Sequence, residues 1–298
     1  MSAGAAGERA GPLLRATILG CGSSGGVPRL GGADAGGNWG ACDPSEPKNR
    51  RLRCALLVER VGPEGVTSVL VDAGPDLREQ LLAARVARLD AVLLTHDHAD
   101  HVHGVDDLRQ IVFLTRERVP VHMDAPTWAV MAARFGYAFE TPDGSLYPPI
   151  LKRREISEAQ IEGAAAPIVI DGPGGAIAAR PFPVEHGPST RALGFRFESA
   201  RAGGAPPAAL AYLPDVSALT QPARAALGGL DLWILDALRY TPHPTHANLE
   251  TALAWISEHR PKRAILTNMH YDLDYATVAA ETPADVEPAF DGMRAELA

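Results

Sequence analysis

The 298-residue chain has only three cysteines, Cys21, Cys42 and Cys54, and no Cys-x-x-Cys pair. A sparse, odd set argues against a disulfide framework and favours a reducing compartment. The chain also lacks any run of about 20 apolar residues, the length that a membrane-spanning helix needs. Its first residues show no signal-peptide pattern. We therefore expect a soluble, cytoplasmic protein with no membrane partner.

The chain has no excess of basic residues, and its formal net charge is −8 at pH 7. Proteins that bind polymeric nucleic acid usually present a basic face, so we expect no large nucleic-acid surface. One segment is locally basic, because Lys48, Arg50, Arg51 and Arg53 fall within six positions. This segment is either a solvated surface loop or a loop that holds a substrate phosphate through its arginines.

Residues 1–13 are rich in alanine and glycine and are expected to form a flexible tail. No linker divides the rest, so residues 14–298 are expected to form one domain. Apolar runs predict strands, and helical spacing predicts helices between them. Strands are expected at 16–20, 54–59, 68–72, 89–94, 119–123, 168–170, 176–184, 193–198, 208–213, 232–235 and 264–267, and helices at 75–85, 106–116, 126–135, 217–227 and 246–259. This alternation, repeated in the two halves, suits two packed sheets with helices outside.

Four metal-ligating side chains lie within six residues, where the apolar run 89–94 gives way to a loop. They are His96, His98, Asp100 and His101. Imidazole nitrogen and carboxylate oxygen suit zinc and its first-row neighbours. One segment can serve two ions if the first two side chains face one ion and the last two face the other. Three of the chain's ten histidines occur here, which argues against a chance cluster in a polar loop.

The pattern His-x-His-x-Asp-His after an apolar strand resembles the signature of the metallo-β-lactamase superfamily of hydrolases. That family also has, in order, an aspartate that ends an earlier strand, a histidine, a second aspartate and a final histidine. In this sequence they are Asp72 in Val-Leu-Val-Asp, His186 in Val-Glu-His-Gly, Asp215 in Tyr-Leu-Pro-Asp and His270 in Asn-Met-His. The resemblance runs from about residue 17 to residue 270. It implies an α/β (α+β) fold, an αββα sandwich of two mixed β-sheets with outer helices.

The resemblance also implies a role for each residue. Seven side chains would hold two divalent ions: His96, His98 and His186 one ion, Asp100, His101 and His270 the other, with Asp215 bridging. Paired ions lower the pKa of a bridging water, so the implied reaction is hydrolysis by a metal-bridged hydroxide. Zn²⁺ is the expected metal, and Mn²⁺ is compatible with the same ligands. Asp72 would support catalysis from outside the ligand set by orienting a ligand or the backbone of the histidine cluster.

A later segment carries a candidate general acid. In the phosphodiesterase branch of this family, a histidine before a late helix is thought to protonate the leaving oxygen. His246 is similar to that histidine, because Leu249 and Ile256 indicate a helix that it opens, and His243 is the alternative. A positioned imidazole acid typically contributes about 10²–10⁴-fold to the rate.

Three segments together are most similar to the cyclic phosphodiesterases and tRNA 3′-processing endonucleases of that branch. They are the glycine-rich turn 20–28, the histidine cluster and Asp-Ala-Leu-Arg-Tyr at 236–240. The turn is expected to line the metal site rather than to open a dinucleotide-binding helix, because glycine and proline continue through Gly40. The resemblance implies a dinuclear hydrolase of small phosphodiesters, cyclic ones included, and a homodimer is possible.

The sequence favours this hydrolase over three alternative functions. A tRNA 3′-processing endonuclease ranks second, because no segment has the length and charge of a tRNA-gripping basic arm. A di-iron redox protein of this fold commonly has a carboxylate where His98 stands. A non-enzymatic binding protein on the same fold conflicts with a complete ligand set. Some family members bind a structural zinc through a cysteine-rich early loop, but here that loop has only Cys42, so no third ion is expected.

Overall fold

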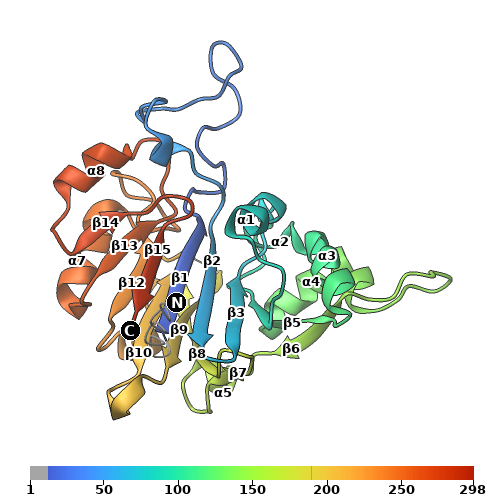
Figure 1. Ribbon diagram of the computed structural model, residues 1–298. Coiled ribbons are helices and arrows are strands. Elements are labelled where there is room, and N and C mark those ends of the chain that lie inside the picture. Colours follow the sequence, from blue (N-terminus) through green and yellow to red (C-terminus); the bar gives the residue numbers. More distant parts are fainter. Residues whose placement is uncertain (1–12, 189) are drawn as a thin grey trace, which may run out of the picture.

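The computed structural model describes residues 13–188 and 190–298 (Figure 1). The predicted flexible tail lies outside these ranges, apart from Leu13, which begins the first strand. Two mixed β-sheets pack against each other with helices on their outer sides, which confirms the predicted sandwich. No helix in the described ranges combines the length and the apolar character that crossing a bilayer requires.

The first sheet has seven strands, which are, in chain order, β1 (Leu13–Gly20), β2 (Ala55–Gly62), β3 (Gly65–Val71), β4 (Ala91–Leu93), β5 (Val119–Met123), β6 (Leu151–Glu155) and β15 (Arg294–Leu297). Their order in space is β15-β1-β2-β3-β4-β5-β6. The pairs from β15 to β3 are antiparallel, and those from β3 to β6 are parallel. The sequence did not predict β6, because its Lys-Arg-Arg-Glu residues are exposed at a sheet edge and show no apolar alternation.

The second sheet has eight strands: β7 (Ile168–Ile170), β8 (Ile177–Glu185), β9 (Arg191–Ser199), β10 (Ala208–Leu213), β11 (Ala218–Leu219), β12 (Leu232–Asp236), β13 (Ala264–Thr267) and β14 (Val286–Pro288). The order is β11-β8-β9-β10-β12-β13-β14, with β7 also paired to β8. Strands β10, β12, β13 and β14 run parallel to one another. Each sheet therefore combines an antiparallel part with a parallel part.

The α-helices are α1 (Leu77–Ala84), α2 (Ala99–Val102), α3 (Leu108–Thr115), α4 (Ala125–Phe139), α5 (Glu158–Ile161), α6 (Gln221–Ala226), α7 (Leu249–His259) and α8 (Tyr275–Glu281). Side-chain caps set several of their starts. The predicted helix at 246–259 begins only at Leu249, because Asn248 accepts a hydrogen bond from the backbone N–H of Thr251. The prediction that His246 opens this helix was wrong, and His246 lies in the loop before it.

Alternate residues of the central strands face different layers of the sandwich. On β3, Val69 and Val71 belong to the core between the two sheets, together with Phe195 and Phe197 from β9. Leu70, between them in the sequence, belongs to the cluster under α1, α3 and α4. Because successive strand residues point to opposite faces, a strand covered on both sides is apolar throughout. This double burial explains the continuous apolar runs in the sequence.

Hydrogen bonds connect the early loop between β1 and β2 to the segment before α8. Arg51 is 1% exposed, and its guanidinium donates to the carbonyl oxygens of His270 at 3.2 Å and Leu273 at 2.6 Å. One of its nitrogens also lies 3.9 Å from Cys42 Sγ. The Asn49 side chain donates to Asp274 at 2.7 Å. An arginine and an asparagine thus hold this loop in place.

Replacing Asp274 with alanine is expected to lower the free energy of unfolding by about 1–3 kcal/mol, because Asp274 caps α8 and accepts from Asp43 N and Asn49 Nδ2. Burial acts to raise the pKa of Asp274, but hydrogen bonds from Thr277, Asn49 and Asp43 lower it to about 2. Its stabilisation is therefore present above its ordinary value of 3.8 and is lost as the pH falls toward about 2. Urea unfolding of the wild type and of Asp274→Ala should give a smaller difference in the free energy of unfolding at pH 3 than at pH 7. An equal difference at both pH values would contradict this role of Asp274.

Candidate metal centre

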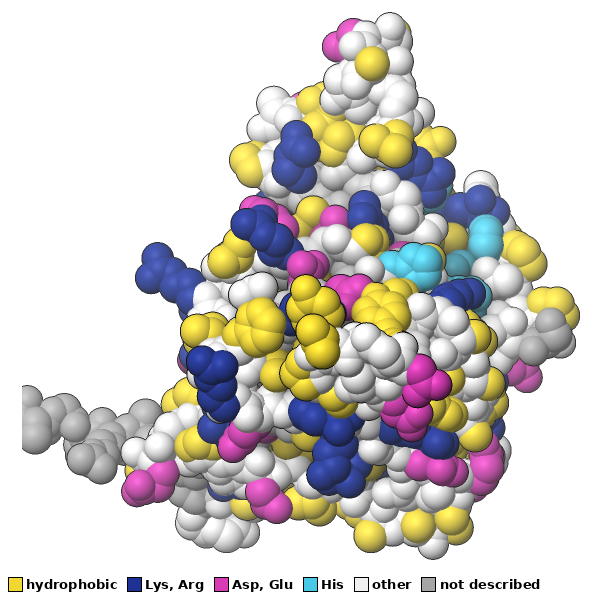
Figure 2. Space-filling view, turned by 90° about the vertical axis from the view of Figure 1, so that its right-hand side faces the viewer, with side chains coloured by type: hydrophobic (Ala, Val, Ile, Leu, Met, Phe, Trp, Pro, Cys, Tyr) yellow, Lys and Arg dark blue, Asp and Glu magenta, His cyan; other side chains and the backbone are white. Residues whose placement is uncertain are grey.

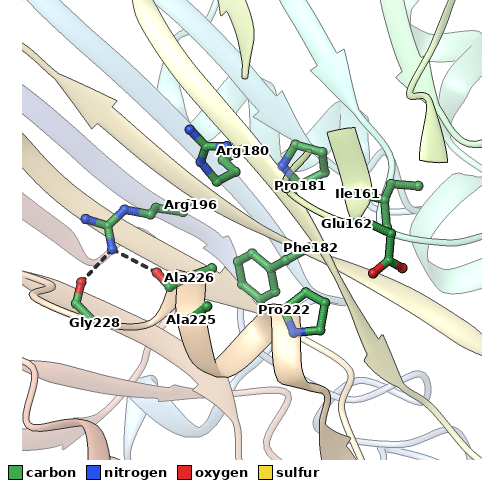
Figure 3. Close-up of a pocket in the computed structure, with 11 residues that line it drawn as sticks. Ile161, Glu162, Arg180, Pro181, Phe182, Arg196, Pro222, Ala225, Ala226 and Gly228 are labelled. Carbon is green, nitrogen blue, oxygen red and sulfur yellow. Dashed lines mark hydrogen bonds between the residues drawn. The ribbon is translucent and has the colours of Figure 1, made fainter. Parts of the chain in front are cut away.

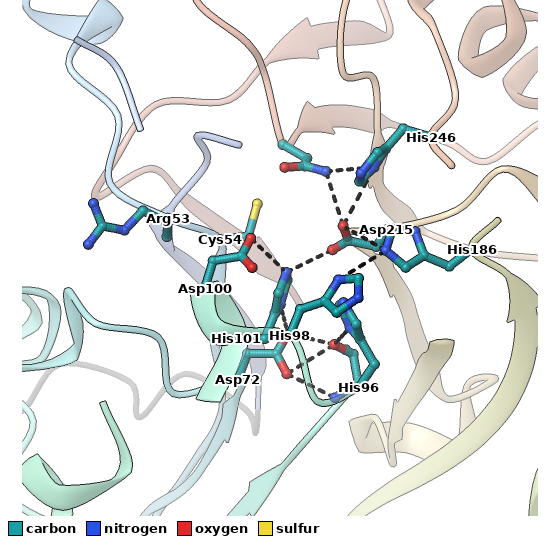
Figure 4. A network of polar contacts seen from close by, with 12 residues as sticks. Arg53, Cys54, Asp72, His96, His98, Asp100, His101, His186, Asp215 and His246 are labelled. Atoms are coloured by element: carbon teal, nitrogen blue, oxygen red, sulfur yellow. Dashed lines mark hydrogen bonds and ion pairs between the residues drawn. The ribbon is translucent and has the colours of Figure 1, made fainter. Parts of the chain in front are cut away.

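The predicted site residues follow the ends of strands from both sheets. Carboxyl ends of parallel strands meet at one edge of a sheet, so the residues after them lie close together. Asp72 follows β3 and the histidine cluster follows β4 in the first sheet, whereas Asp215 follows β10 in the second. His186 follows β8 in the antiparallel part of the second sheet. Figure 4 shows these side chains pointing toward one another between the sheets.

His96, His98 and His186 form one compact group, in which one nitrogen from each ring lies within 4.8 Å of the others. His98 Nδ1 and His186 Nε2 are 3.3 Å apart. His186 Nδ1 donates to the carbonyl oxygen of Thr245 at 2.8 Å. Because that hydrogen bond places the proton on Nδ1, the neutral ring turns an unprotonated Nε2 toward the group. These three imidazoles are therefore arranged as metal ligands.

His101 and Asp215 form a second group with His96. Asp72 is fully buried, and its carboxylate lies 2.7 Å from His101 Nδ1 and accepts from the backbone N–H of Thr95 at 2.8 Å. This pairing turns His101 Nε2 toward the carboxylate of Asp215, 2.9 Å away. Asp72 therefore lies where it fixes both the ring of His101 and the backbone at the start of the histidine cluster.

One buried polar atom of this cluster has no partner. His96 Nε2 is inaccessible and forms no hydrogen bond within the described ranges, whereas Asp215 Oδ2 contacts His101 Nε2 at 2.9 Å. A buried polar atom without a partner is costly, and a metal ion would satisfy His96 Nε2. Burial, followed by the nearby His101, holds the pKa of His96 well below its ordinary value, so its ring is neutral and able to ligate. Imidazole and carboxylate donors fit a zinc or manganese ion.

The two other predicted ligands lie at the edge of the cluster. Asp100 Oδ2 is 3.4 Å from His101 Nε2, and both Asp100 and His270 line the cavity in front of the cluster. His270 Nδ1 is 3.0 Å from Asp272 Oδ1. Neither residue belongs to the three close ligand groups that the described ranges contain. The structure thus brings five of the seven predicted ligands together and leaves Asp100 and His270 as adjacent candidates.

His246 lies beside Asp215 and is held by an aspartate that sequence reasoning missed. Its Nδ1 is 2.8 Å from Asp236 Oδ2 and 3.5 Å from Asp215 Oδ1. Asn268 donates to the other oxygen of Asp236 at 3.2 Å. Burial acts to lower the pKa of His246, but the charge and hydrogen bond of Asp236 raise it to about 9. His243 is farther from this network, with its Nδ1 bonded to Thr245.

The cavity in front of the cluster has a volume of about 530 Å³ and a basic rim formed by Arg29 and Arg239. Figure 2 shows histidine side chains emerging among Lys and Arg side chains on one face of the molecule. Most cations of the predicted basic segment, 48–53, contact other parts of the protein and do not line this cavity. Lys48 lies over the ring of Tyr275 at 4.3 Å, and Arg50 lies over that of Trp39 at 5.2 Å.

Two other cavities lie away from the cluster. One has a volume of about 410 Å³ and is lined by residues that include Phe182 and Arg196 (Figure 3). Arg196 donates hydrogen bonds to the carbonyl oxygens of Ala226 and Gly228. This cavity contains neither His nor Cys. The loop 139–149 lines the other cavity together with Phe113 on α3. Neither of these two cavities contains a group of metal-ligating side chains.

Adding Zn²⁺ to metal-free protein is expected to raise its melting temperature by about 5–10 °C at a hundredfold excess over Kd, because ligand binding to the folded state alone contributes about 2.7 kcal/mol. The shift should disappear in His96→Ala, which removes a ligand of both groups. It should persist in His122→Ala, since His122 lies on β5 outside the cluster. Thermal scans with and without chelator measure it, and an unchanged melting temperature would show that the cluster binds no ion.

A two-sheet sandwich with a His/Asp cluster at its strand ends defines the class of metal-binding proteins with the metallo-β-lactamase fold. The model of the β-lactamase superfamily domain matches residues 67–271, more than half of the chain. The chain therefore belongs to that superfamily, as its motifs predicted.

Known proteins resemble the chain to different extents. It is 27% identical over 286 residues to an octanoyltransferase of Porphyromonas gingivalis, a match that covers 95% of this chain and 51% of that protein. The chain thus spans about half the length of that relative. A ribonuclease Z of Bradyrhizobium sp. is 42% identical over 74 residues, 24% of this chain and 23% of that protein. The crystal structure of a diphosphatase from the PhnP family superimposes with a TM-score of 0.78 and 31% identity, covering 96% of this chain and 97% of that one.

Proposed function

We propose that this protein is a metal-dependent phosphodiesterase that cleaves small phosphodiesters, cyclic ones included, with His246 as the general acid. The observation that carries the proposal is the His246–Asp236 pair beside Asp215, in the same cavity as the metal-ligating cluster. Hydrolysis of a phosphodiester needs both electrostatic stabilisation and a proton for the leaving oxygen. The resemblance to a diphosphatase supports the assignment.

The metal ions would be held by His96, His98 and His186 on one side and by His101 and Asp215 on the other, with Asp100 and His270 as further ligands. When bound, divalent ions at such a site activate water and stabilise negative charge on phosphoryl oxygens. Asp72 keeps the Nδ1 of His101 engaged and its Nε2 turned toward Asp215, where it could ligate an ion. The carbonyl of Thr245 does the same for His186.

His246 supplies the proton in this proposal. Its Nδ1 is engaged by Asp236, so the other ring nitrogen, Nε2, is available to a leaving oxygen in the cavity that His246 lines. Asp236 stabilises the protonated ring, and Asn268 fixes that carboxylate from its other oxygen. A histidine held in this way can be protonated at neutral pH, although burial alone would oppose its charge.

A tRNA 3′-processing endonuclease is the second candidate, and the local match to ribonuclease Z favours it. Against it, three cations of the early loop are engaged within the protein: Lys48 and Arg50 lie over aromatic rings, and Arg51 is buried. A substrate panel on protein of known metal content separates the candidates. Bis-p-nitrophenyl phosphate and a 2′,3′-cyclic nucleotide should be hydrolysed at least as well as precursor tRNA is cut. Preferential cutting of precursor tRNA would favour the endonuclease, and hydrolysis of none of the three would refute both.

A further inference from the structure

The segment 289–293 connects β14, in the second sheet, to β15, in the first (Figure 1). Its backbone is hydrogen-bonded to both sheets. The N–H of Ala289 donates to the carbonyl oxygen of Leu266 on β13 at 2.9 Å. The residue after Asp291 donates to the carbonyl oxygen of Ile18 on β1 at 2.7 Å. Asp291 lies between these two hydrogen bonds, so the position of its backbone is fixed by both sheets.

The carboxylate of Asp291 joins two further backbone segments. Its Oδ1 accepts from the backbone N–H of Cys21 at 3.1 Å, and its Oδ2 accepts from the backbone N–H of Leu52 at 2.7 Å. The Cys21 thiol also donates to Oδ1 at 3.4 Å. Cys21 begins the glycine-rich turn after β1, and Leu52 lies in the loop before β2. One side chain therefore holds the end of β1 and the approach to β2 together.

The surroundings of this carboxylate favour a role at these two backbone positions. In the described ranges its hydrogen bonds come from backbone N–H groups and a thiol, and none comes from a cationic side chain. Burial raises the pKa of Asp291 to about 7, although the hydrogen bonds from Leu52 and Cys21 and the charge of Arg51 act to lower it. Placing a carboxylate in such surroundings is costly unless its acceptors are needed there.

Both of the joined segments support the backbone around His270. The carbonyl oxygen of Cys21 accepts from the backbone N–H of Met269 at 2.8 Å. In the second segment, the guanidinium of Arg51 donates to the carbonyl oxygen of His270 at 3.2 Å. The two residues that Asp291 binds are therefore next to, or identical with, the residues that hold Met269 and His270.

The supported backbone has a conformation that needs support. Asn268, just before Met269, has a φ of +59°, in the left-handed region that residues other than glycine rarely adopt. Such a conformation persists only where the surrounding structure holds it. Here the N–H of Met269 binds Cys21, and the N–H of His270 donates to the carbonyl oxygen of Leu238 at 2.8 Å. Weakening the first of these contacts would free the backbone that carries His270.

We infer that Asp291 is a positioning residue of the metal centre, which holds His270 beside the cluster through the backbone of Cys21 and Leu52. This inference rests on the proposed function, in which His270 is a metal ligand. It gives a role to the C-terminal segment, which lies outside residues 67–271, the part that the superfamily model matches. Groups that orient metal ligands typically contribute about 10- to 100-fold to metal affinity.

The test measures the affinity of metal-free protein for Zn²⁺ by calorimetry in the presence of a competing chelator. Asp291→Ala should weaken one of two zinc-binding steps by about 10- to 100-fold and leave the other nearly unchanged. Asp291→Asn keeps one carbonyl acceptor and should lose less affinity than Asp291→Ala. Asp285→Ala is the matched control and should bind Zn²⁺ like the wild type, because Asp285 is an exposed aspartate before β14.

A double variant distinguishes positioning from a general loss of packing. His270→Ala should weaken the same zinc-binding step as Asp291→Ala. The variant with both substitutions should bind Zn²⁺ no more weakly than His270→Ala alone, because Asp291 acts through His270. A general loss of packing would instead add to the effect of His270→Ala. Circular dichroism and urea unfolding of the metal-free proteins establish that each variant is folded.

Hydrolysis of bis-p-nitrophenyl phosphate, measured on the same samples, separates this inference from the proposed function. A wild type that binds two zinc ions but hydrolyses no phosphodiester would refute the phosphodiesterase, and the zinc affinities would still decide on Asp291. Wild-type zinc affinity in the folded Asp291 variants would overturn the inference. An additive loss in the double variant would overturn it as well.

Discussion

Asp215→Asn is expected to lower kcat/KM for bis-p-nitrophenyl phosphate by at least about 10³-fold, a loss of about 4 kcal/mol in transition-state stabilisation. Asp215 is 4% exposed and belongs to two of the three close ligand groups, which it shares with His96, His101, His186 and His246. An amide of the same shape keeps the packing but removes the negative charge that a bridging ligand supplies. Initial rates at fixed metal concentration, with bound metal quantified in the same samples, measure the effect.

The matched control for this variant is Asp171→Asn, because Asp171 is an exposed aspartate after β7, beside the start of β8 and so at the opposite end of β8 from His186. The control should retain both wild-type activity and metal content. If Asp215→Asn bound the same amount of metal and kept activity within about tenfold of wild type, the bridging role of Asp215 would be wrong.

His246→Ala is expected to lower kcat by about 10²–10⁴-fold on phosphodiesters with alkoxide leaving groups, and by less than about tenfold on p-nitrophenyl esters. An alkoxide must be protonated as it leaves, whereas p-nitrophenolate is stable as an anion. Removing a general acid therefore slows alkoxide release selectively, whereas removing a metal ligand should also slow hydrolysis of p-nitrophenyl esters strongly. Steady-state rates with a dinucleotide and with bis-p-nitrophenyl phosphate provide the comparison.

His243→Ala is the companion variant, because His243 is the alternative acid and its ring centre lies 5.2 Å from that of His246. The geometry favours His246, since Asp236 engages that ring and no carboxylate pairs with His243 in the described ranges. His243→Ala should therefore reduce both rates by a similar, small factor. A large loss confined to alkoxide leaving groups in His243→Ala would transfer the acid role to His243.

Much of the fold could be predicted because buried strands have a clear local signature. The runs at β5, β7, β10 and β13 have the predicted bounds, since each is a short apolar segment bounded by turn residues. Segments whose pairing is decided by tertiary contacts were missed. The strand β15 contains charged residues, so its local sequence does not predict a strand. It forms because it pairs with β1 at the edge of the sheet.

The site was predictable to the extent that its residues lie in motifs. The contiguous cluster His96–His101 and the strand-ending Asp72 could be recognised directly. Asp236 and Asn268 lie in the segments Asp-Ala-Leu-Arg-Tyr and Asn-Met-His, but nothing in these segments predicts that either side chain contacts His246. Their role depends on the parallel pairing of β12 with β13, which brings both residues to His246. The sequence also could not predict which arginines line the cavity. The structure places Arg29 and Arg239 at its rim, whereas the basic segment 48–53 does not line it.

The most direct test is a titration of metal-free protein with Zn²⁺ or Mn²⁺, in which hydrolysis of bis-p-nitrophenyl phosphate and bound metal are measured together. If histidines and aspartates from both sheets jointly hold a catalytic pair of ions, activity should be absent without metal and should reach its plateau at two ions per chain. Activity that is already complete in metal-free protein, or a fully loaded protein that hydrolyses no phosphodiester, would contradict the account.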